Sequence, residues 1–102
     1  MKSIKEICAE LAGVEMGLMQ GSVGFRFDPA VRAKKAGHPV EIMDDILSVF
    51  NYDVKRGGTP ERGTVAKTLE KLQAFRETYG VADLDAPLGE LSAWLTAAEA
   101  AD

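Results

Sequence analysis

Apolar side chains recur at steps of three and four along most of this chain, and that spacing limits what it can fold into. In the first such segment, residues 3–20, the apolar positions are Ile4, Ile7, Leu11, Val14 and Leu18. A helix of 3.6 residues per turn gathers these positions on one stripe, which is typical of a face that packs against a core. Comparable stripes lie in residues 39–56, 60–79 and 85–98. The spacing therefore predicts an all-α fold.

The ends of these segments carry helix start and stop signals. Ser3 and Glu6 have the spacing of a capping box at the beginning of the first helix. Gly80 followed by Val81 is typical of a glycine stop of the Schellman type, and Asp85 is the expected N-cap of the last helix. We expect the helix before Gly80 to begin either at the Thr59-Pro60 pair or at Thr64.

A shorter fifth helix is predicted over residues 29–37, after Asp28-Pro29 and before Gly37. Residues 22–27 alternate apolar and other side chains, so they form either an extended connector or one short strand. With 102 residues, 46% of them hydrophobic, the chain is long enough for one core. We predict a single all-α domain over residues 1–102, a compact bundle of about five helices.

Composition excludes several broad classes. A net charge of −4 argues against a protein that binds nucleic acid through a general basic surface. The single cysteine, Cys8, falls in the first apolar stripe, where we expect a buried thiol and a reducing compartment. No apolar run approaches the roughly 18 residues of a membrane span, and the first residues are too polar for a signal peptide. We expect a cytoplasmic protein outside the membrane.

The sequence lacks a phosphate-binding glycine loop, paired Cys/His sets at metal spacing and a G-x-S-x-G turn. His38, the only histidine, precedes Pro39 and has no evident catalytic partner. We therefore expect a binding protein that is not an enzyme and that uses neither a cofactor nor a metal.

Small residues form a second strip on the first helix. They recur every fourth residue, and each glycine inside a helix costs about 1 kcal/mol relative to alanine. A smooth strip allows another backbone to come close, either from a partner or from within the domain. The candidate partner-binding residues of this helix are Glu6, Ala9, Glu10, Gly13, Met16 and Gly17.

Acidic residues share one face of the predicted helix over residues 39–54. Its members, which follow the first at offsets of three, four, seven and eleven residues, are Glu41, Asp44, Asp45, Ser48 and Tyr52. Charge is segregated along the chain: residues 39–54 carry a net −4, and residues 55–76 carry a net +4. Segregated charge of this kind indicates a surface that selects its binding partner electrostatically. The face is either a solubilising surface or a second candidate partner-binding site, made of Glu41, Asp44, Asp45 and Tyr52.

Two charged residues project into apolar stripes, Glu15 in the first helix and Arg76 in the fourth. The stem of an arginine can cover apolar surface, but a buried carboxylate without a cation is costly. The simplest prediction is an ion pair between Glu15 and Arg76.

The stretch GTVAKTLEKL, residues 63–72, resembles the recognition-helix region of winged-helix and helix-turn-helix regulators. The resemblance implies DNA contacts from Arg62, Thr64, Lys67 and Lys71, first to phosphates and then to bases. Glu70 and Glu77 on the same helix would repel phosphates. A DNA-binding transcriptional regulator that uses helix 64–79 is therefore the alternative function.

In general character, as a small, acidic, helical chain with segregated charge, the protein resembles the small inhibitors of phages and mobile elements, above all the type I anti-CRISPR proteins. The resemblance implies a stoichiometric inhibitor or modulator that docks on a host nucleic-acid-handling complex and blocks nucleic-acid binding. The expected partner is accordingly a protein. We expect no direct contact with nucleic acid.

Overall fold

The computed structural model of the protein describes residues 2–20 and 39–101. These residues form four α-helices, α1 (Ile4–Gln20), α2 (Pro39–Lys55), α3 (Arg62–Tyr79) and α4 (Asp85–Ala100), and a short 3-10 helix, η2 (Ala82–Leu84). The prediction of an all-α bundle of about five helices is confirmed. The helix predicted over residues 29–37 and the extended segment predicted over 22–27 lie outside the described residues, whereas η2 was not predicted.

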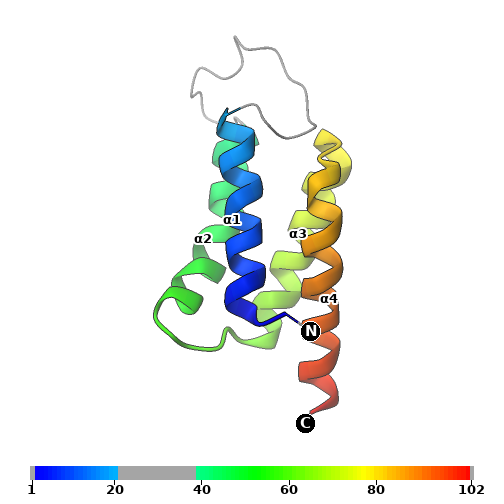
Figure 1. Ribbon diagram of the computed structural model, residues 1–102. Coiled ribbons are helices and arrows are strands. Elements are labelled where there is room, and N and C mark those ends of the chain that lie inside the picture. Colours follow the sequence, from blue (N-terminus) through cyan, green and yellow to red (C-terminus); the bar gives the residue numbers. More distant parts are fainter. Residues whose placement is uncertain (1, 21–38, 102) are drawn as a thin grey trace.

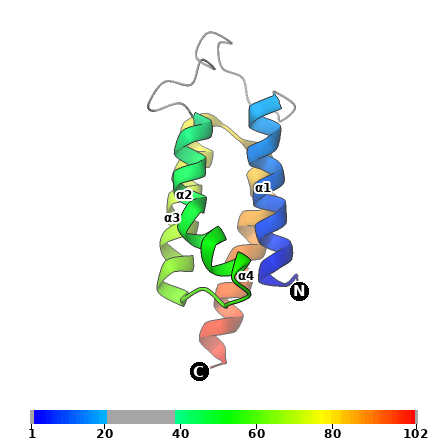
Figure 2. The same ribbon diagram turned by 90° about the vertical axis from the view of Figure 1, so that its left-hand side faces the viewer.

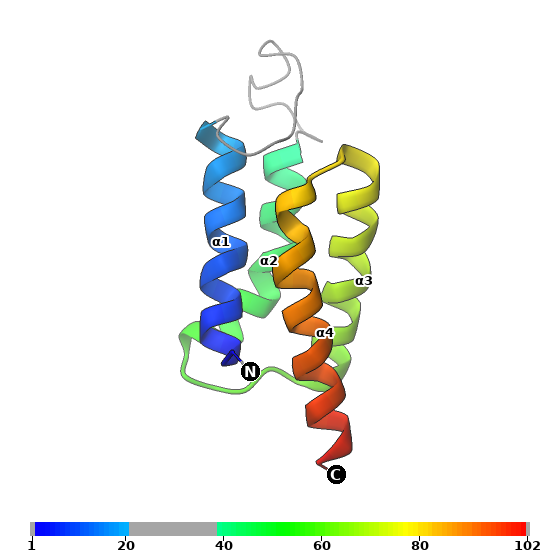
Figure 3. The ribbon, with the colours of Figure 1, turned by 45° about the vertical axis from the view of Figure 1, so that its right-hand side comes forward.

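The four long helices form an up-down-up-down bundle (Figure 1). α1 packs against α2 and α4, and α3 packs against the same two helices. Consequently α1 and α3 lie diagonally across the bundle, as do α2 and α4. Figure 3 shows that α4 continues past the ends of the other helices toward the C-terminus.

The core consists mainly of the predicted stripes, to which Val81 and Leu84 of the α3–α4 connection are added. Its fully buried side chains are Ile7, Leu11, Leu18, Met43, Leu47, Phe50, Val65, Leu72, Val81, Leu84 and Leu91. Each long helix contributes to this set, so burial of the stripes sets how each helix is rotated about its axis. Cys8 is also buried, as predicted.

The predicted caps are present at two helix ends. The Glu6 amide donates to the Ser3 hydroxyl and the Ser3 amide donates to the Glu6 carboxylate, both at 3.2 Å. Gly80 adopts a left-handed conformation, φ 65°, and its amide donates to the Arg76 carbonyl at 2.8 Å. This single bond defines the αL form of the glycine stop, so the stop lies at Gly80 as predicted but is not of the Schellman type.

The predicted Glu15–Arg76 ion pair is wrong. Arg76 instead binds Asp85 across the α3–α4 turn, with Nε to Oδ1 at 2.8 Å and Nη2 to Oδ2 at 3.1 Å. Glu15 belongs to α1 and Arg76 to α3, the helices that lie diagonally and do not pack together. The prediction that Asp85 is the N-cap of the last helix is also wrong, because Asp85 is the first residue of α4 and Leu84 is the N-cap. The Arg76 guanidinium holds the pKa of Asp85 below its ordinary value.

Candidate interaction surfaces

The predicted acidic side chains of α2 share one exposed face. We call this set the acidic face: Glu41, Asp44, Asp45, Ser48 and Tyr52, all of them exposed. Met43 and Phe50, on the other side of α2, are fully buried and fix the rotation of the helix. Figure 2 shows α1 and α2 running side by side at the front of the bundle. Three carboxylates therefore lie within two turns of helix and face solvent.

The far end of the acidic face is aromatic. Tyr52 is 60% exposed, which is high for so large a side chain. The Arg56 guanidinium donates to its hydroxyl at 3.0 Å, and Arg56 Cζ lies 5.2 Å from the ring centroid. These contacts orient the ring while leaving it open to solvent. Exposed aromatic side chains of this kind are enriched where proteins meet.

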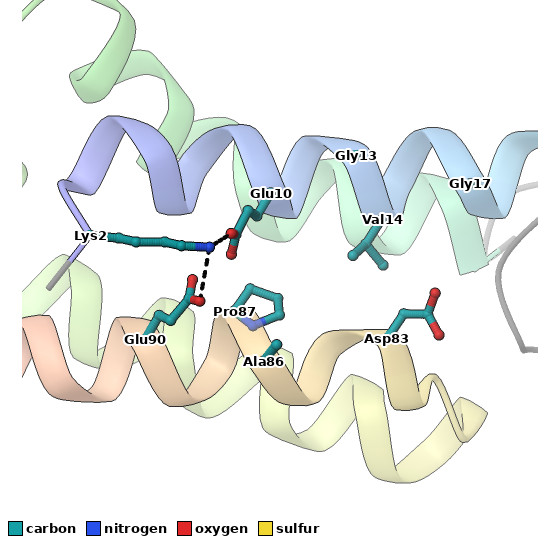
Figure 4. Close-up of a pocket in the computed structure, with 9 residues that line it drawn as sticks. All are labelled: Lys2, Glu10, Gly13, Val14, Gly17, Asp83, Ala86, Pro87 and Glu90. Atoms are coloured by element: carbon teal, nitrogen blue, oxygen red, sulfur yellow. Dashed lines mark hydrogen bonds and ion pairs between the residues drawn. The ribbon is translucent and has the colours of Figure 1, made fainter.

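A groove separates α1 from α4. It encloses about 430 Å³ and is lined by Lys2, Glu10, Gly13, Val14, Gly17, Asp83, Ala86, Pro87 and Glu90. Figure 4 shows Glu10 and Glu90 facing each other from the two helices, with Lys2 reaching between them. We call this feature the α1–α4 groove.

The α1–α4 groove carries an excess of negative charge. The Lys2 ammonium pairs with Oε1 of Glu10 and, at 3.1 Å, with Oε1 of Glu90. The second carboxylate oxygen of each, Oε2, is buried and has no hydrogen-bond donor among the described residues. One lysine thus serves two carboxylates, and Asp83 adds a third acid at the other end of the groove.

The strip of small residues on α1 is twisted. Four residues turn an α-helix by about 40° more than one full turn, so a strip with that spacing drifts around the helix. Ala9 and Gly13 are exposed, whereas Gly17 is buried. A Cβ added to Gly13 would meet no atom within 4 Å. The strip therefore begins in solvent and ends against α4.

The other two candidate residues of α1 lie outside the groove. Met16 is 53% exposed. Glu6 is exposed too, but its carboxylate accepts the capping bond from the Ser3 amide. Of these two residues, Met16 is therefore the one that gives a partner an exposed apolar side chain.

The residues of the alternative DNA-binding prediction lie along α3. Arg62, Lys67 and Lys71 are exposed, and Thr64 is half-buried. However, α2 and α3 run antiparallel and side by side, joined by residues 56–61 (Figures 1 and 2). In a helix-turn-helix the two helices cross steeply after a turn of three or four residues. The arrangement here is that of a bundle.

Of the nine residues that line the α1–α4 groove, the sequence predicted only Glu10, Gly13 and Gly17 as site residues. Lys2, Asp83 and Glu90 were not predicted as site residues, although each lines it. They come from opposite ends of the chain, and only the packing of α4 on α1 brings them together. No local sequence pattern indicates that these residues form a site, because each is a charged residue of the kind commonly found on a protein surface.

Comparison with protein-family models, with curated proteins and with solved structures finds no match to this chain. None of the helices in residues 2–20 and 39–101 has both the length and the apolar character that crossing a bilayer requires. Across the same residues, no three His, Cys, Asp or Glu side chains gather in a way that could hold a metal ion. Among the described residues, the acidic face and the α1–α4 groove are the surfaces best suited to hold a partner.

Proposed function

We propose that this protein acts by binding another protein stoichiometrically, as an inhibitor or modulator of a nucleic-acid-handling complex of the host. The observation that carries the proposal is the exposed acidic face of α2, in which three carboxylates and an oriented tyrosine lie along one side of the helix. The proposal includes a cytoplasmic location, since a reducing compartment suits a free cysteine.

A basic surface is the natural complement of this face. Glu41, Asp44 and Asp45 form a row of negative charge, as phosphates do along a nucleic-acid strand. Surfaces that hold nucleic acid are basic, so they attract such a row and raise the rate of association at low salt. A protein seated there would exclude the nucleic acid. In the α1–α4 groove, the carboxylates of Glu10 and Glu90 also bind a cation, the Lys2 ammonium. A basic partner surface would therefore complement this side of the molecule as well.

The test is affinity capture from host lysate with two charge-reversal variants. Glu41, Asp44 and Asp45 are changed to lysine in the first variant. Three exposed acids elsewhere, Glu70, Glu77 and Glu99, are changed to lysine in the control, which has the same change in net charge. We expect wild type and control to capture the same partner and the first variant to lose it, mainly through slower association at low salt.

The captured complex then provides the functional readout. Adding the protein at one equivalent should abolish nucleic-acid binding by the partner. If the first variant captures the same proteins as wild type, the acidic face is only a solubilising surface. Sub-micromolar, salt-sensitive binding of the free protein to duplex DNA would instead favour the regulator that uses Lys67 and Lys71.

A further inference from the structure

The α1–α4 groove already holds one cation, the Lys2 ammonium of this chain. Lys2 precedes α1, and its ammonium pairs with one carboxylate from each wall, Glu10 of α1 and Glu90 of α4 (Figure 4). Asp83 lines the groove at its other end. The charged lining residues are thus three acids and one base, a net charge of −2. Electrostatically, the groove is therefore a site for a positively charged group.

Lys2 leaves this carboxylate pair incompletely bonded. It reaches Oε1 of Glu10 and of Glu90, whereas Oε2 of both is buried without a donor among the described residues. A buried carboxylate oxygen without a hydrogen bond costs free energy. An ammonium is a compact charge with three donors, but a guanidinium presents five N–H donors in a planar fork and binds carboxylates through paired bonds. A guanidinium between the two helices would therefore supply donors for the oxygens that Lys2 leaves unbonded.

The rest of the groove suits the stem of an arginine side chain. Gly13 is exposed on the rim, and a Cβ there meets no atom within 4 Å. Figure 4 shows Val14 of α1 and Pro87 of α4 directed into the space between the two helices. The methylene groups of arginine pack on apolar surface of this kind while the guanidinium reaches a polar site. The groove volume of about 430 Å³ lies within the range of about 300–1,000 Å³ that is usual for ligand sites.

Building on the proposed function, we propose that the α1–α4 groove binds an arginine side chain of the partner protein, whose guanidinium replaces the Lys2 ammonium between Glu10 and Glu90. Arginine is a main component of surfaces that contact nucleic acid, and it is enriched where proteins meet. The Lys2 side chain is 42% exposed and lies ahead of Ile4, the first residue of α1, so it can turn out to solvent without unwinding the helix. Lys2 is thus the occupant of the free protein that the partner displaces.

The test is an NMR titration of the ¹⁵N-labelled full chain with a probe that carries one arginine, the capped peptide acetyl-Gly-Arg-Gly-amide. Two matched peptides carry lysine or citrulline in place of arginine, and citrulline has nearly the shape of arginine without its charge. We expect the arginine peptide to shift the amide resonances of Gly13 and Ala86 saturably. The lysine peptide should bind more weakly, and the citrulline peptide should not bind. Equal affinity for the arginine peptide and either of the others would overturn the proposal.

Two variants, each with a control of the same charge change, locate the binding. Glu90→Gln removes one carboxylate, so the Kd of the arginine peptide should rise about tenfold, as for the loss of one charge-assisted hydrogen bond. Its control, Glu99→Gln, changes an exposed residue of α4 outside the groove and should leave the Kd unchanged. Lys2→Ala removes the competing cation, so the Kd should fall by about threefold or more, whereas Lys5→Ala, on the exposed surface of α1, should not lower it.

The peptide titrations use no partner, so they separate the groove from the proposed function. An unchanged Kd in Glu90→Gln or in Lys2→Ala would overturn the arginine site, whatever the lysate capture shows. If the acidic-face variant keeps its partner, the proposed function is contradicted while the peptide result stands. Glu90→Gln should also weaken capture of the partner, and capture at the wild-type level would overturn the placement of the partner's arginine in the groove.

Discussion

Replacing Gly13 by leucine tests whether the α1–α4 groove is open to a partner or is filled by packing between α1 and α4. In the structure Gly13 is exposed on the rim of the α1–α4 groove, and a Cβ there meets nothing within 4 Å. Gly89 of α4 is exposed and equally unobstructed, but it does not line the groove. Gly13→Leu and Gly89→Leu therefore make the same change in helical propensity, and only the first fills the groove.

The magnitude follows from two effects. Replacing a mid-helix glycine by leucine gains about 0.5–0.8 kcal/mol in helical propensity. A leucine at residue 13 that covers about 40 Å² of groove gains about 1 kcal/mol more, and ordering its side chain costs a similar amount. We expect both variants to be more stable than wild type by about 0.5–1 kcal/mol, which raises Tm by about 3–6 °C.

Thermal and urea melts followed by far-ultraviolet circular dichroism measure these changes. Affinity capture then asks whether Gly13→Leu loses the partner while Gly89→Leu keeps it. A fall in stability of more than about 1 kcal/mol in Gly13→Leu alone would refute the reasoning. It would mean that α1 and α4 lie closer in solution than in the structure, and that the strip of small residues serves internal packing.

Other measurements test particular contacts. The folded-state pKa of Glu15, about 7, exceeds its ordinary value of 4.5, so the folded protein retains this proton at higher pH than the unfolded chain does. Its free energy of unfolding should therefore fall as pH rises from about 4.5 to about 7 and then level off, by about 1–2 kcal/mol after allowing for partial exposure. Gly80→Ala should cost about 1 kcal/mol in urea unfolding, because residue 80 has φ 65°. Phe50→Ala should cost about 3–5 kcal/mol in the same assay, since the ring is fully buried.

Local patterns determined much of this fold in advance. The four long helices, their buried stripes and the glycine stop at Gly80 were all predictable, because helix formation and capping depend on residues within a few positions of one another. The exposure of the acidic face followed for the same reason. Once Met43 and Phe50 are buried, geometry turns Asp45 to solvent.

Tertiary packing alone decided which helices are neighbours. The neighbouring helices in turn determine which charged side chains can pair. The apolar stripe of α1 could pack against any of the other stripes, since burial of apolar surface has no direction. The order of the bundle kept Glu15 of α1 away from Arg76 of α3, and Arg76 pairs with Asp85 instead. It also placed Lys2 between Glu10 and Glu90, which come from opposite ends of the chain. The sequence by itself thus determined the helices and their faces, whereas the α1–α4 groove and the ion pairs of Lys2 within it arise only when those faces meet.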